Sequence, residues 1–143
     1  MKSVIKFKKI KIDAMGCHLL INVKINSKKV TLVLDTGASQ TVLDFETANS
    51  FTKNIAEQLH ELSSTGVGGE PLESHMIIIE KFKIGDVVIR DNLFVLLDLQ
   101  HVNAQYEKMG IPGIHGVLGG DILSAFNAVI DYKKSTLTLK YKK

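Results

Sequence analysis

The hydrophobic positions of this chain fall mostly in short runs that are separated by turn residues. A short apolar or alternating run between such residues is typical of a β-strand. The runs predict strands over residues 19–25, 30–34, 39–43, 76–82, 87–96, 129–132 and 135–139. The pairs Gly85-Asp86 and Lys133-Lys134 predict hairpin turns. Many short strands joined by tight turns favour an all-β fold, either a small closed barrel or a sandwich.

Three longer segments depart from this strand pattern. Residues 44–62 carry apolar side chains at near-helical spacing and predict a partly helical segment. Residues 121–126 predict a short helix that Asp121 would cap at its N-terminus. Residues 98–115 are polar and interrupted by glycine and proline, so we expect a loop there. The prediction is therefore a barrel with one or two short helices, and the 143 residues indicate a single domain over 1–143.

The most informative stretch runs from Leu32 to Ser39 with the sequence Leu-Val-Leu-Asp-Thr-Gly-Ala-Ser. Its apolar run predicts a buried strand that ends directly at Asp35. Gly37 permits a sharp reversal and a close approach of the backbone to whatever Asp35 binds. Read locally, the stretch is also consistent with a simple Asx-type turn.

A second motif lies far downstream, where Gly116 to Leu123 reads Gly-Val-Leu-Gly-Gly-Asp-Ile-Leu. Its apolar residues, glycine pair and acidic residue predict a strand that passes into a helix. Together, the Asp-Thr-Gly-Ala loop and this segment resemble the retropepsin-like aspartic proteases, over residues 19–139. In that family the second segment crosses beneath the catalytic loop, and the fold is a small closed β-barrel.

The resemblance implies an aspartic peptidase that hydrolyses peptide bonds, with Asp35 catalytic and Thr36 and Gly37 in support. Two carboxylates that share a proton supply both the base and the acid that this hydrolysis needs. The chain holds one Asp-Thr-Gly, so the resemblance implies a homodimer in which each subunit contributes one Asp35. Asp121 is the obvious second carboxylate within the chain, but the family places that residue at the helix start. Asp44 and Asp131 are interpreted as surface residues.

The resemblance also implies substrate-binding residues in two regions. The glycine-rich segment before residue 76 matches the position of the family's flap, and its tip would be Gly66, Val67, Gly68 and Gly69. An ordinary surface loop is the alternative there. Beside the catalytic loop, we expect peptide or protein substrates to contact Ala38, Val117 and Leu118. Alanine at 38, where two-lobed relatives carry a hydroxyl, implies a weakly acidic to neutral working range. The rival function is an inactive module of this fold that binds peptides or dimerises.

Composition argues against disulfide-stabilised, membrane-bound and metal-dependent classes of protein. There is one cysteine, Cys17, expected half-buried in a strand, so no internal disulfide can form. The sequence shows no signal peptide and no membrane-length apolar run, which favours a cytoplasmic protein without a membrane partner. The five histidines show no metal spacing, and we expect no metal and no cofactor.

Both ends of the chain are rich in lysine, within a formal net charge of +3. Few aromatic residues accompany these lysines, so we do not expect nucleic acid as a partner. Pairing like-charged strands across a dimer axis is unfavourable. We therefore predict that at least one terminal strand pairs within its own subunit.

Overall fold

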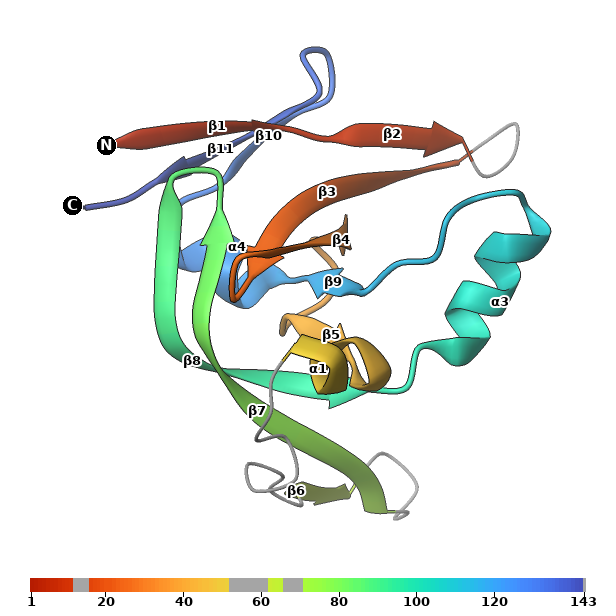
Figure 1. Ribbon diagram of the computed structural model, residues 1–143. Helices are drawn as coiled ribbons and strands as arrows, with labels where there is room; N and C mark the ends of the chain where they lie inside the picture. The colour runs from red at the N-terminus through yellow and green to blue at the C-terminus, as the bar shows by residue number, and fades with distance from the viewer. Residues whose placement is uncertain (12–15, 52–61, 66–70, 143) are drawn as a thin grey trace.

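The computed structural model describes residues 1–11, 16–51, 62–65 and 71–142 (Figure 1). Its helices are α1 (Phe45–Phe51), α3 (Gln100–Lys108) and α4 (Gly120–Ala125). Its strands are β1 (Lys2–Lys6), β2 (Lys8–Lys11), β3 (Cys17–Ile25), β4 (Lys28–Leu34), β5 (Val42–Asp44), β6 (Leu62–Thr65), β7 (Pro71–Ile84), β8 (Val87–Leu97), β9 (Gly116–Leu118), β10 (Val129–Asp131) and β11 (Thr136–Lys140).

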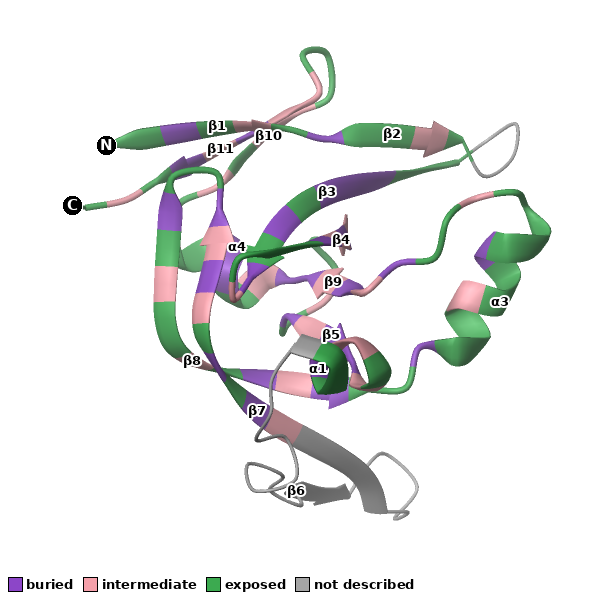
Figure 2. Cartoon of the chain, in the orientation of Figure 1, coloured by how far each residue is buried: buried purple, intermediate pink, exposed green. Residues whose placement is uncertain are grey.

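Six strands close into a barrel in the order β3-β4-β9-β5-β8-β7, because β7 pairs back onto β3. Most pairs are antiparallel, whereas β4–β9 and β5–β8 are parallel. Buried residues alternate with more exposed ones along much of β3 and β4 (Figure 2), as expected for strands with one face toward the interior. Phe82 and Phe94 pack there with ring centroids 4.8 Å apart, and both are fully buried. The closed β-barrel predicted from the sequence is confirmed.

A second sheet of three strands joins the two ends of the chain in the order β1-β11-β10. β1 and β11 are antiparallel over their whole length, from Lys2 opposite Lys140 to Lys6 opposite Thr136. Backbone hydrogen bonds between Met1 and Tyr141 extend this pairing. Leu137 and Leu139 face the core. Both terminal strands therefore pair within one chain, in agreement with the prediction from the lysine-rich ends.

Several local expectations need correction or refinement. The segment 98–115 is not a loop throughout, because it contains helix α3. That helix escaped prediction because its residues are mostly polar, with only Tyr106 buried, and because the glycine and proline residues that indicated a loop lie after its end. Cys17 is exposed rather than half-buried. The strand expected over 39–43 is β5, which starts later, at Val42.

Asp44 is buried, although its sequence context indicated a surface residue. One carboxylate oxygen accepts a hydrogen bond from the Leu99 amide at 3.0 Å. The other accepts from the amide and hydroxyl of Thr47, at 3.3 and 3.2 Å, and so caps helix α1. α1 confirms the helical part of the prediction for 44–62 up to Phe51. None of the described helices is long and apolar enough to span a bilayer.

Candidate active site

Asp35 follows the last residue of β4 and stands at the mouth of the barrel. Its amide donates to the Leu118 carbonyl at 3.1 Å, which extends the parallel pairing of β4 with β9. Its Oδ1 accepts from the Gly37 amide at 2.8 Å, so the locally expected Asx-type turn is present. The Asp35 side chain is exposed. The fold thus presents a carboxylate to solvent from a backbone that is anchored to a buried strand.

The second glycine-rich motif lies directly against this loop. An added Cβ on Gly119 would stand 2.6 Å from the Gln40 carbonyl oxygen, so only glycine fits there. The Gly120 amide donates to the Ala38 carbonyl at 2.7 Å, and the Asp121 amide donates to the Ser39 carbonyl at 3.1 Å. The free backbone amides in the first turn of α4 are therefore satisfied by carbonyl groups of the loop that follows Asp35. These contacts hold the loop from beneath.

The sequence predicted that Asp121 would cap helix α4, and this prediction is wrong. The cap position is Gly119, and no side chain caps it. Asp121 Oδ1 instead accepts from the amide and the hydroxyl of Thr41, at 2.9 and 2.7 Å. The hydroxyl of Thr41, which is buried, in turn accepts from the Gly119 amide at 3.0 Å. Asp121 is therefore a structural brace and is not among the residues that line the cavity at Asp35.

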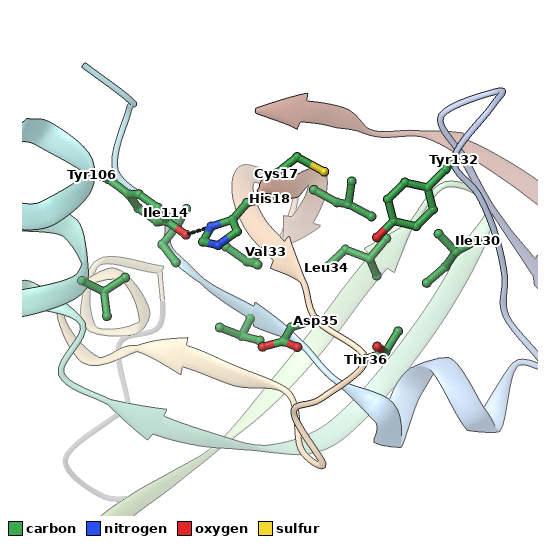
Figure 3. A pocket seen from close by; sticks show the side chains of 13 residues that line it. Cys17, His18, Val33, Leu34, Asp35, Thr36, Tyr106, Ile114, Ile130 and Tyr132 are labelled. Atoms are coloured by element: carbon green, nitrogen blue, oxygen red, sulfur yellow. Dashed lines mark hydrogen bonds between the residues drawn. The ribbon is translucent and has the colours of Figure 1, made fainter. Parts of the chain in front are cut away.

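A cavity of about 490 Å³ opens beside Asp35 (Figure 3). Of the residues proposed from the sequence, it is lined by Asp35, Thr36 and Val117. Gly37 lies in the adjacent turn. The rest of the lining is largely apolar and comes from β3, β4, α3, the segment before β9, strand β10 and the β10–β11 turn, with members that include Leu19, Val33, Val102, Ile114, Ile130 and Tyr132.

The remaining predicted contacts divide into three cases. Ala38 contributes its backbone carbonyl to the start of α4. Leu118 is fully buried in the barrel core, which leaves it no side-chain surface to offer a substrate. The flap residues Gly66, Val67, Gly68 and Gly69 lie outside the described residues.

Sequence reasoning missed a pair of residues in the cavity wall, His18 of β3 and Tyr106 of α3. The Tyr106 hydroxyl lies 2.6 Å from His18 Nδ1, and the two rings meet edge to face (Figure 3). Burial, followed by the nearby Asp35 carboxylate, raises the pKa of the Tyr106 phenol above its ordinary value of 10.0. The phenol is therefore held in its neutral form, and it docks α3 against the cavity. The residues are 88 positions apart, and no local signal pairs them.

The chemistry available to this cavity is limited, because the described residues place a single carboxylate in its lining. Peptide hydrolysis requires a base for the water and an acid for the carbonyl oxygen. Among the described residues, no group of three or more His, Cys, Asp and Glu side chains could hold a metal ion. Within that part of the chain, Asp35 is the only acidic residue of the cavity lining. A second acid would have to come from elsewhere.

Comparisons with known proteins agree with this architecture. The sequence model of the family described as aspartyl protease matches residues 21–122. A retropepsin-like aspartic protease from Rickettsia conorii superposes with a TM-score of 0.62 at 21% identity, covering 99% of this chain and 90% of that one. The retroviral protease-like domain of Ddi1 from Leishmania major superposes with a TM-score of 0.60 at 18% identity, covering 87% and 90%.

Among curated protein sequences, none is similar enough to count as a match. The structural neighbours share the retropepsin-like barrel, and the family match includes both the Asp35 loop and the start of α4. The chain therefore belongs to the aspartyl protease family, and its barrel has the retropepsin-like fold.

Proposed function

We propose that the protein is an aspartic endopeptidase that acts as a homodimer, with one Asp35 from each subunit in the catalytic dyad. The observation that carries the proposal is the position of Asp35. Its carboxylate is exposed, borders a cavity and accepts a hydrogen bond from the Gly37 amide at a point where a buried strand ends. A carboxylate that served only to shape the turn would not need that cavity.

The dyad supplies what a single chain lacks. Two carboxylates a few ångströms apart cannot both ionise cheaply, so they hold one proton between them. The ionised member removes a proton from water, and the protonated member donates to the carbonyl oxygen of the scissile peptide bond. A two-fold axis beside Asp35 creates this pair from two identical chains.

The surroundings of Asp35 support such an axis. Thr36 is exposed, and its hydroxyl makes no hydrogen bond among the described residues. The Gly37 amide donates a hydrogen bond to Oδ1 of Asp35, whereas Oδ2 makes no hydrogen bond to any described residue. We propose that Thr36 bonds across the axis and that Oδ2 faces the water and the partner carboxylate. Extended peptide would lie along the cavity, with Val117 in an apolar subsite and Gly66 to Gly69 as the flap.

The first experiment replaces Asp35 with asparagine, whose amide cannot share the dyad proton. We expect Asp35→Asn to abolish cleavage of a peptide library while leaving the thermal unfolding temperature nearly unchanged. Asp91→Asn is the matched control, because Asp91 is exposed on β8 with φ 50°, a conformation that asparagine also tolerates. Cleavage by Asp35→Asn at the wild-type rate would refute the assignment.

A second experiment tests the shared site by mixing subunits. Random exchange of equal amounts of wild-type and Asp35→Asn chains leaves about a quarter of the dimers with two aspartates. Activity per wild-type subunit should therefore fall to about half, and Asp91→Asn should cause no such fall. Unchanged activity after demonstrated exchange contradicts an intersubunit dyad. If the wild-type protein cleaves nothing and yet binds peptides, the rival function as a binding module is supported.

A further inference from the structure

Three lysines stand side by side on the outer surface of the barrel. Lys24 of β3 is directly opposite Lys29 of β4 on one side and Lys83 of β7 on the other. Directly opposite residues of an antiparallel pair have Cβ atoms about 4.5–5.5 Å apart. We call Lys24, Lys29 and Lys83 the lysine row. The register alone therefore places three positive charges next to one another across three strands.

Such an arrangement is unfavourable unless something neutralises it, because like charges directly opposite one another destabilise a sheet. Within the described part of the chain, none of these three ammonium groups makes a hydrogen bond or an ion pair. In the β7–β8 hairpin, Lys81 lies two positions from Lys83 and directly opposite Arg90. This pair is also of like charge. The fold thus concentrates positive charge here without an internal counter-ion from the described residues.

The lysine row borders a hollow of about 330 Å³. Besides the three lysines, its lining includes Ile5, Asn22 and Gly85, and no acidic residue. Asn22 Oδ1 is occupied by the Thr31 hydroxyl at 2.9 Å, which leaves the amide NH₂ group as a further donor. The nearby Asp86 is engaged with Ser3 of β1 at 3.4 Å through its carboxylate. The hollow therefore offers only cations, neutral donors and apolar walls.

This hollow is separate from the cavity at Asp35. No residue lines both. Lys29 lies near the start of β4 and Asp35 follows its end, six positions later, or about 20 Å along the strand. The tip of the β7–β8 hairpin also lies on the side of the barrel away from α3 (Figure 1). A ligand in the hollow would leave the peptide cavity open.

We propose that the lysine row binds a small polyphosphate group, either inorganic or carried by a nucleotide. Lysine ammonium groups are compact point charges that bind phosphate oxygens. Several linked phosphates between the three lysines would replace their mutual repulsion by attraction. No aromatic ring lines the hollow, so a base would find no stacking surface. Recognition would rest on the phosphates alone.

The test titrates the full-length chain with sodium tripolyphosphate by calorimetry at low and moderate salt. Lys24→Gln removes the central charge and should weaken binding at least about tenfold. Without the anion, the same substitution should raise the unfolding temperature, because it relieves the repulsion. Lys134→Gln, in the exposed β10–β11 turn, is the control and should weaken binding less than about twofold.

Each outcome decides the proposal. Equal losses in Lys24→Gln and Lys134→Gln, or no binding by the wild type, overturn it, because diffuse surface charge would then explain the result. A second titration uses ATP without magnesium. Similar affinity for both anions supports recognition of the phosphates, and binding of tripolyphosphate alone supports an inorganic ligand. Much tighter binding of ATP overturns the proposal. Asp35→Asn should bind the anion normally, so this test is independent of peptidase activity.

Discussion

Substitution of Tyr106 by phenylalanine isolates the contact that docks α3 beside the cavity. The ring stays in place and keeps its edge-to-face contact with His18, so only the hydroxyl and its 2.6 Å hydrogen bond are lost. A neutral hydrogen bond of this kind contributes about 1 kcal/mol to the free energy of unfolding. His18 is exposed, so water can replace the lost partner and no large penalty follows. For a chain of this length, the unfolding temperature should fall by about 4 °C at neutral pH.

The same variant carries a pH signature. The folded state raises the pKa of Tyr106 above 10.0, through burial first and Asp35 second. The unfolded chain therefore loses this proton at a lower pH than the folded chain does. The stabilisation is complete below the unfolded pKa and is lost as the pH rises through the folded pKa. Phenylalanine has no proton to lose, so the stability gap between wild type and Tyr106→Phe should shrink as the pH rises above about 10.

Urea unfolding at neutral pH and across the alkaline range measures both effects. The control is Tyr132→Phe, which removes the hydroxyl of an exposed tyrosine on the other side of the cavity. That variant should unfold within about 0.5 kcal/mol of the wild type. The reasoning is refuted if both variants lose equal stability at neutral pH. It is also refuted if the gap for Tyr106→Phe stays constant while the wild type titrates.

Two further predictions concern the support beneath the Asp35 loop. Gly119→Ala should cost about 1–3 kcal/mol in urea unfolding, because its Cβ would lie 2.6 Å from the Gln40 carbonyl oxygen. Gly120→Ala, whose Cβ would make an ordinary contact at 3.4 Å, should be nearly neutral, and equal costs would contradict the steric argument. Asp121→Ala should cost about 2–3 kcal/mol, because it strands the buried donors of Thr41. Asp121→Asn keeps an acceptor and should lose less stability while retaining peptide cleavage, and loss of all cleavage in that stable variant would identify Asp121 as a reacting acid.

Features determined by neighbouring residues could be predicted from the sequence. The turn at Gly85-Asp86 joins β7 to β8 as expected, because glycine supplies the positive φ of 57° there. The strand before Asp35 was also predictable, since its apolar run is continuous and bounded by turn residues. In both cases, the local preference and the barrel favour the same conformation.

Features determined by distant residues could not be predicted in this way. Asp44 is buried, and it accepts a hydrogen bond from the Leu99 amide, 55 positions later. Asp121 meets Thr41 across 80 positions instead of capping its own helix. Leu118 looks like any apolar residue beside the loop, and only its place between β4 and β5 shows that it faces the core. A periodic sequence pattern shows which residues are apolar, but it does not show which distant polar group will become the hydrogen-bond partner of a given side chain.

The insertion of β9 between β4 and β5 has a consequence for the order of folding. Asp35 obtains its amide partner from Leu118, and the loop after it rests on Gly120 and Asp121. These contacts span more than 80 positions of the chain, and long-range contacts form late because loop closure must come first. During synthesis the N-terminal strands emerge long before residue 116. A growing chain therefore cannot complete the contacts that shape the Asp35 loop until residues 116–121 have left the ribosome.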